Sequence, residues 1–313
     1  MRLFKRLFLY TLLSIFAFFS FTEDIFASEK KTIGVILPSN VPYYEEVHNY
    51  VLKKLEENII SGNVDFIIQK PFPDVIAISN AARKLIALNV DVILCYGTSA
   101  AIAVIRERPY QPVVYVAGYA PVMERYRSNN ITGVEFKTPL SSITRYLNSM
   151  KEIKSIGVVY NPLESDSVYQ LNEILKCCPY YKISVVKIPV KTVSDLKEFL
   201  QGTTVDALVF TTSSIANIAL SEIHEYSLNK KIPVATLLPR KDARPLISLH
   251  PSAKKQAEKA GLILHSILRG KRPSDIPRDM SADMELFFYL GEAYKMNIRI
   301  PADLLTEATE VIY

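Results

Sequence analysis

The sequence predicts an α/β protein of two doubly wound parallel-sheet lobes with a ligand cleft between them. Short apolar runs rich in β-branched residues alternate with amphipathic stretches of helical period, which is typical of a parallel sheet covered by helices on both faces. This alternation occurs twice, and 313 residues exceed what a single hydrophobic core usually contains. Hydrophobic residues at 49% and charged residues at 22% agree with a globular chain.

Residues 1–27 have the features of a secretory signal peptide. Three basic residues precede an almost wholly apolar stretch at 7–21, and Ile25-Phe26-Ala27 resembles a small-residue cleavage site. The apolar stretch is shorter than the roughly 20 residues of a membrane-spanning helix. We expect secretion across the inner membrane and a periplasmic or otherwise extracytoplasmic location. An uncleaved signal that anchors the protein to the membrane is the alternative.

The charge of the chain argues against a nucleic-acid partner. The formal net charge is +5, and because residues 1–27 carry three basic and two acidic side chains, the remainder carries +4. The basic residues are spread along the chain without the stripe or cluster that a nucleic acid requires. We interpret the charge as an ordinary solvated surface.

The first lobe is predicted to span residues 28–121, with a returning segment at about 246–275. Its helices are predicted at 43–58, at 75–88 and directly after Gly97-Thr98-Ser99. Its strands are predicted at 32–37, 64–69, 91–96 and 112–117.

The second lobe is predicted to span residues 122–245, with a returning segment at about 276–313. Its helices are predicted at 165–176, 193–200 and 215–228. Its strands are predicted at 156–160, 183–188, 206–210 and 233–237, followed by one at 245–249. A long helix at 252–268 and a strand near 284–288 are expected to cross back between the lobes.

Polar residues follow several of these strands. In an open α/β sheet, ligands bind at the carboxyl ends of the strands, where helix N-termini present free N–H groups. The candidate ligand-binding residues are Ser39, Asn40, Gly97, Thr98, Ser99, Tyr119, Asn161, Asp166, Thr212 and Ser213.

Three features near the strand ends have two interpretations each. Gly97-Thr98-Ser99 begins an alanine-rich helix and is either an anion-binding helix start or a plain N-cap. Asp166 either meets a ligand ammonium group or stabilises the first turn of its helix. Tyr43-Tyr44, just beyond the first strand, either stacks on a ligand or belongs to the core.

No catalytic, metal or cofactor motif is visible. The sequence lacks G-x-S-x-G, H-E-x-x-H, Walker A and G-x-G-x-x-G patterns, and Ser99 has no base nearby in sequence. The four histidines are scattered, and Cys95, Cys177 and Cys178 fit neither a disulfide framework nor metal-ligand spacing. We therefore expect no catalytic residue, no metal and no cofactor.

Several segments, taken in order, resemble those of a known family: TIGVILP, DVILCYGTSAA, NITGVEFKTP, IGVVYNPLESDSV, VDALVFTTSS, HPSAKKQAEKAGLILHSILRGKRPSDIP and IPADLLTEATEVIY. Together they resemble the ABC transporter substrate-binding protein family whose best-known members bind tryptophan or tyrosine. The resemblance implies the periplasmic-binding-protein type I fold, with the strand-end candidates above lining the cleft and with Thr98 and Ser99 suiting a ligand carboxylate. The chain departs from the family pattern at Ala120-Pro121, at Thr212-Ser213-Ser214 and at His250-Pro251, where the family commonly carries acidic or aromatic residues.

The resemblance implies the solute-binding component of an ABC importer, with a small polar ligand such as an amino acid and an ABC permease as partners. A monomer is expected. The first alternative is a sensory binding protein that docks on a signalling receptor, and the second is an extracytoplasmic enzyme. Neighbouring genes for a permease and an ATPase would favour transport, whereas a neighbouring sensor kinase or cyclase would favour sensing. Turnover lost on mutation of one strand-end residue would favour an enzyme.

Overall fold

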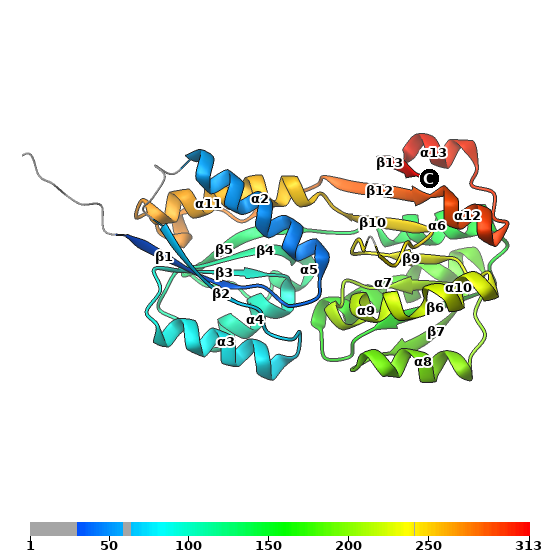
Figure 1. The fold of residues 1–313 in the computed structure, drawn as a ribbon, viewed down its shortest axis with the longest axis horizontal. Helices are drawn as coiled ribbons and strands as arrows, with labels where there is room; N and C mark the ends of the chain where they lie inside the picture. Colours follow the sequence, from blue (N-terminus) through cyan, green and yellow to red (C-terminus); the bar gives the residue numbers. More distant parts are fainter. Residues whose placement is uncertain (1–29, 59–63, 241) are drawn as a thin grey trace, which may run out of the picture.

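A computed structural model describes residues 30–58, 64–240 and 242–313, which form two α/β lobes side by side (Figure 1). The predicted secretory signal at residues 1–27 lies outside the described residues. Each lobe is built on one sheet with helices on both faces, as the alternating sequence pattern predicts. No helix in the described ranges is both long and apolar enough to cross a membrane.

The first lobe contains a six-stranded parallel sheet between two helical layers. Helices α2 and α11 pack on one face, and α3 and α4 pack on the other. The strands lie in the order β11 (Asp279–Met280), β5 (Ile131–Phe136), β4 (Val113–Tyr119), β3 (Val92–Tyr96), β1 (Lys31–Ile36) and β2 (Val64–Gln69). The helices of this lobe are α2 (Pro42–Asn58), α3 (Val75–Ala87), α4 (Thr98–Arg106), α5 (Ala120–Met123), α11 (Ala253–Leu268) and the 3-10 helix η3 (Pro273–Asp275).

The second lobe contains a seven-stranded sheet in which only the pair β10–β12 is antiparallel among the described strands. The strands lie in the order β13 (Glu310–Ile312), β12 (Met284–Tyr289), β10 (Ile247–Pro251), β9 (Val234–Thr236), β8 (Ala207–Phe210), β6 (Ser155–Tyr160) and β7 (Ser184–Pro189). Its helices are α6 (Leu140–Met150), α7 (Ser165–Cys177), η1 (Cys178–Tyr181), α8 (Val193–Gln201), α9 (Ser214–Leu220), η2 (Ser221–Ile223), α10 (His224–Lys230), α12 (Leu290–Met296) and α13 (Ala302–Glu307).

Local sequence accounts for most of these elements. All five residues of β3 are buried, which explains why its sequence, VILCY, is continuously apolar rather than alternating. Helix α3 begins where the Asp74 carboxylate accepts hydrogen bonds from the N–H groups of Ile76 and Ala77, both at 2.9 Å. The single helix predicted at 215–228 is instead α9, η2 and α10 in succession.

The chain changes lobes at positions other than the predicted ones. β5 pairs with β4 in the first sheet, although the predicted second lobe begins at residue 122. β10 pairs with β9 and β12 in the second sheet, although 246–275 is predicted to belong to the first lobe. β11 returns to the first sheet beside β5. Pairing between strands distant in sequence decides lobe membership, and a local hydrophobic pattern does not contain that information.

Candidate functional site

The strand ends of the two lobes meet at the junction between them. Residues that follow β3 and β4 in the first lobe contact residues that follow β6 and β8 in the second. The Ser99 hydroxyl donates to Glu164 Oε2 at 3.5 Å, and the rings of Tyr119 and Tyr169 lie edge to face with centroids 5.8 Å apart. The junction is therefore closed by direct contact between polar and aromatic side chains of both lobes.

Glu164, at the N-cap position of α7, is the most connected residue of this junction. It is buried, and its Oε1 accepts hydrogen bonds from Asn161 Nδ2 at 2.9 Å and from the Ser213 hydroxyl at 2.8 Å. Its Oε2 accepts from the Ser214 N–H at 3.3 Å as well as from Ser99. Asn161, which follows β6, and Ser213 and Ser214, which follow β8, thus hold the Glu164 carboxylate between the lobes.

Asp166 lies in the first turn of α7 and is also buried. Its Oδ2 accepts a hydrogen bond from the Thr212 hydroxyl at 3.0 Å, and Gln170, one turn further along α7, accepts from the Thr212 N–H at 2.8 Å. The other carboxylate oxygen, Oδ1, has no hydrogen-bond partner in the described part of the chain. The structure therefore leaves one acceptor of Asp166 unused inside the junction.

The two carboxyl groups resist ionisation in this closed form. Burial, together with the nearby charge of Asp166, raises the pKa of Glu164 to about 7 against the lowering effect of the Ser213 hydrogen bond. Burial likewise raises the pKa of Asp166, opposed by its hydrogen bond from Thr212. Within the described ranges, no Lys, Arg or His forms an ion pair with either group. A positive charge placed between them would lower both pKa values.

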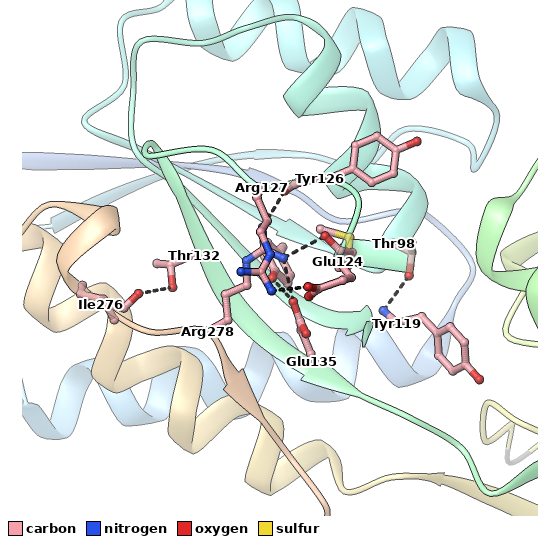
Figure 2. A network of polar contacts seen from close by, with 11 residues as sticks. Thr98, Tyr119, Glu124, Tyr126, Arg127, Thr132, Glu135, Ile276 and Arg278 are labelled. Carbon is pink, nitrogen blue, oxygen red and sulfur yellow. Dashed lines mark hydrogen bonds and ion pairs between the residues drawn. The ribbon is translucent and has the colours of Figure 1, made fainter. Parts of the chain in front are cut away.

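The first lobe contributes backbone and hydroxyl groups. Gly97 has a φ of 84° and precedes the first turn of α4, and a Cβ there would collide with the Tyr44 hydroxyl. The Thr98 hydroxyl accepts a hydrogen bond from the Tyr119 N–H at 2.9 Å, which ties α4 to the end of β4 (Figure 2). This wall therefore presents a helix N-terminus, with its partial positive charge, toward the two carboxyl groups.

Aromatic side chains form the other part of the wall. Tyr119 lies edge to face with Phe136 as well as with Tyr169, at centroid distances of 5.4 Å and 5.8 Å. The Tyr119 hydroxyl and Gln170 Nε2 are buried without a well-formed hydrogen bond among the described residues. These two groups face each other, and the Asp166 carboxylate lies on an adjoining side chain near the Thr98 hydroxyl.

Little free space remains at the junction. The enclosed cavity between Tyr44, Gly97, Glu164 and Asp166 measures about 10 Å³, enough for about one water molecule. A groove of about 440 Å³ continues from Ser99 and Glu164 along the outer side, between α3 and the loop after β6. A solute larger than water fits between Glu164 and Asp166 only when the lobes separate.

Eight of the ten sequence candidates come together around the carboxyl groups of this junction, and two do not. Ser39 donates its N–H to the Pro71 carbonyl at 2.8 Å, and the Asn40 carbonyl accepts from Arg240 at 3.0 Å. The loop after β1 pairs with the loop after the edge strand β2. Ser39 and Asn40 therefore lie away from the carboxyl groups, and Asn40 meets the second lobe at Arg240 instead. The residues brought together are Gly97, Thr98, Ser99, Tyr119, Asn161, Asp166, Thr212 and Ser213.

Sequence reasoning missed three residues of the junction: Glu164, Gln170 and Tyr169. The sequence could have indicated them through their position close to Asp166, at the N-cap of α7 or on the helix itself. Gln170 is four residues after Asp166, so both lie on one face of the helix. Glu164 stands at the N-cap, where an acidic side chain is usually exposed, and only the contact with the first lobe buries it.

Solved structures resemble this chain in fold. A conserved domain protein from Vibrio cholerae is 20% identical with a TM-score of 0.83, covering 90% of this chain and 100% of that one. An ABC domain from Streptococcus pneumoniae in complex with L-Trp is 19% identical with a TM-score of 0.80 and the same coverages. The ligand-free, open structure of a substrate-binding protein from Clostridium difficile is 20% identical with a TM-score of 0.63, covering 90% and 99%.

These likenesses, together with those to sugar- and leucine-binding proteins, show the periplasmic-binding-protein type I fold. A comparison with curated protein sequences found no match. The model of one protein family, described as ABC transporter substrate binding protein, matches residues 46–312. With two lobes, a polar junction between them and a family match over most of its length, the chain belongs to the ABC transporter substrate-binding protein family.

Proposed function

We propose that this protein is the extracytoplasmic solute-binding component of an ABC importer and that its lobes close on a small ligand carrying an ammonium group. The observation that carries the proposal is the buried pair Glu164 and Asp166, which has no cationic partner in the described chain. A buried carboxylate pair without a cation is costly, and an ammonium ion between the two groups offsets that cost.

The opposite wall suits the other end of an amino acid. The N-terminus of α4 at Thr98 and Ser99 would receive a carboxylate, while Tyr119 and Tyr169 would contact an apolar side chain. The Streptococcus pneumoniae relative, whose structure is a complex with L-Trp, makes aromatic amino acids the first ligands to try. The Tyr119 hydroxyl and the Gln170 amide, which face each other in the closed form, would then hydrogen-bond to the ligand.

Closure would couple ligand capture to docking on a membrane permease. This chain has a TM-score of 0.80 with the L-Trp complex and 0.63 with the open, ligand-free protein, in keeping with its closed junction. In the closed form, Ile76 of the first lobe and Leu163 of the second are 74% and 65% exposed, and both line the groove. A permease that contacts both lobes would recognise this closed arrangement, which the ligand favours by binding it more tightly.

A thermal-shift experiment with matched ligands tests the ammonium site. L-tryptophan and tryptamine carry an amine, whereas indole-3-propionate has the same ring and carboxylate without the amine. We expect the amines to stabilise the protein, by about 2.7 kcal/mol at a hundredfold excess over Kd. Stabilisation by indole-3-propionate equal to that by L-tryptophan would contradict the ammonium site. If none of the three compounds stabilises the protein but a nucleoside, a small amide or an organic acid does, the protein remains a solute receptor and its ligand belongs to another class.

A further inference from the structure

A second cavity lies at the junction of the lobes, away from the cleft described above. It measures about 390 Å³, within the range of small-molecule sites, and shares no lining residue with the cleft or its groove. Tyr43 and Glu46 of α2 contribute from the first lobe, and strands β10, β12 and β13 contribute from the second. These three strands lie together at one edge of the second sheet (Figure 1).

The floor of this cavity is one face of the sheet edge. Glu285, Phe287 and Tyr289 alternate along β12, so their side chains share a face, and all three line the cavity. Glu310 of β13 stands opposite Phe287 in the parallel register. His250 of β10 lies edge to face with Phe287, with ring centroids 4.9 Å apart. Strand pairing therefore presents aromatic rings and carboxylates side by side.

The charge of the lining is strongly negative. Four carboxyl groups, those of Glu46, Glu285, Glu292 and Glu310, line the cavity together with a single arginine, Arg244. Two of the acids have partners, because Glu285 lies 3.3 Å from His250 Nε2 and Glu292 accepts from Lys295 at 3.0 Å. Glu46 and Glu310 form no ion pair within the described residues. The lining therefore favours a cation over an anion or a neutral molecule.

Buried polar atoms without partners also face this cavity. The Tyr43 side chain is 1% exposed, and its hydroxyl has no hydrogen-bond partner in the described ranges. Burial, Tyr44 and the carboxylates of Glu285 and Glu46 keep the pKa of this hydroxyl well above its ordinary value, so it remains a hydrogen-bond donor and acceptor. Glu292 is likewise 1% exposed, and its Oε2 has no hydrogen bond, with His224 Nε2 3.8 Å away. Buried polar atoms are normally satisfied, and a bound group would satisfy both.

We propose that this cavity, between α2 and the β10–β12–β13 edge, is a second ligand site that takes a small organic cation. The carboxylates of Glu46 and Glu310 would attract its ammonium group, the Tyr43 hydroxyl would hydrogen-bond to it, and the Phe287 and Tyr289 rings would contact it by cation–π interaction. Because α2 belongs to one lobe and β12 to the other, the cation bridges the lobes outside the cleft.

Isothermal titration calorimetry of the purified protein tests this site, with tyramine and choline as cationic probes. The control is 3-(4-hydroxyphenyl)propionate, which has the ring of tyramine and the opposite charge. The cavity variants are Glu46→Gln, at a half-buried position, combined with Glu310→Gln, at an exposed one, and Tyr43→Phe, which removes only the unpaired hydroxyl. The variant Asp166→Asn separates this site from the cleft.

We expect at least one of the two cations to bind and the propionate not to bind. The double variant should weaken cation binding by about 25-fold, about fivefold for each charge removed, while Tyr43→Phe weakens it several-fold without lowering Tm. Asp166→Asn should leave this binding event in place. Loss of cation binding in Asp166→Asn alone, equal binding of the propionate, or failure of both tyramine and choline to bind would each overturn the proposal.

Discussion

Two regions of this molecule bury carboxyl groups in contrasting ways. In the first lobe, Glu135 of β5 accepts hydrogen bonds from the Tyr115 hydroxyl and from Arg278, at 3.2 Å for the latter (Figure 2). Arg278 also donates to the carbonyls of Met123 at 2.8 Å and Tyr126 at 2.6 Å. Between the lobes, Glu164 and Asp166 receive hydrogen bonds from hydroxyls, an amide and a backbone N–H but have no cation.

The difference separates a structural network from a candidate binding site. The Glu135 network contains its own counter-ion, and it ties the segment before β11 to β4 and β5, where the chain returns to the first lobe. The Glu164–Asp166 pair is held in position but remains electrostatically incomplete. A buried acid with its own cation indicates a structural network, whereas two buried acids without one indicate a place for a ligand.

The largest effect should come from breaking the complete network. Arg278→Ala leaves Glu135 buried without its cation and removes two hydrogen bonds to backbone carbonyls, so the free energy of unfolding should fall by about 3 kcal/mol. Chemical denaturation measures this loss. The matched control is Arg272→Ala in the same segment, where the exposed pair with Asp275 should contribute almost nothing to stability. Equal losses in both variants would contradict the comparison.

The incomplete pair should make closure depend on pH. The pKa of Glu164 is about 7 in the closed form against an ordinary 4.5, so the closed state keeps a proton that the open, hydrated state has released. The closed state is thus most stable at low pH, and its stability relative to the open state falls by up to about 3 kcal/mol as the pH rises through 7. The pKa of Asp166 is raised as well, so its effect has the same sign.

Interlobe fluorescence energy transfer in the ligand-free protein, between about pH 4 and pH 8, measures this dependence. The distance between labels should increase toward high pH in the native protein. Glu164→Gln, which cannot ionise, should flatten the curve. A lobe distance that decreases as the pH rises would contradict this prediction, because it would mean that the closed form stabilises the ionised carboxylates.

Removing one charge from the pair should weaken binding of an amine ligand more than it affects folding. Asp166→Asn preserves an oxygen that accepts from Thr212, but it removes the charge that faces the ammonium, so affinity should fall by about 2 kcal/mol, roughly 30-fold. Calorimetry with the amine identified by thermal shift measures the loss. Asp195→Asn, at an exposed capping box on α8, is the control and should bind normally. Unchanged affinity in Asp166→Asn would place the ammonium elsewhere.

The smallest effect should come from the hydroxyl that links the lobes. Ser99 donates to Glu164 over 3.5 Å, a long hydrogen bond at a partly exposed position, so Ser99→Ala should change closure by less than about 0.5 kcal/mol. The same energy-transfer measurement detects the change. A much larger effect would make this single contact, rather than the carboxylate pair, the element that holds the lobes together.

Much of this organisation was predictable from sequence. The apolar runs VILCY and ALVF are buried strands, Asp74 begins a helix, and the polar residues after β3, β4, β6 and β8 lie at one junction. These features follow from periodicity, from capping and from the rule that the carboxyl ends of parallel strands face the ligand. Each of these features depends either on neighbouring residues or on the regular alternation of strands and helices, so it can be predicted from the sequence alone.

Other features were decided only by tertiary structure. β5 and β10 belong to sheets other than the predicted ones because their partners are distant in sequence. Ser39 and Asn40 lie beside the loop after the edge strand β2, away from the carboxyl groups of the junction. Glu164, an ordinary N-cap residue by sequence, is buried because the first lobe covers it. Sequence by itself determined the elements and the edge of each sheet that carries polar groups. Packing between distant segments determined which of those groups lost water, and desolvation is what turns a helix-cap carboxylate into a candidate ligand-binding group.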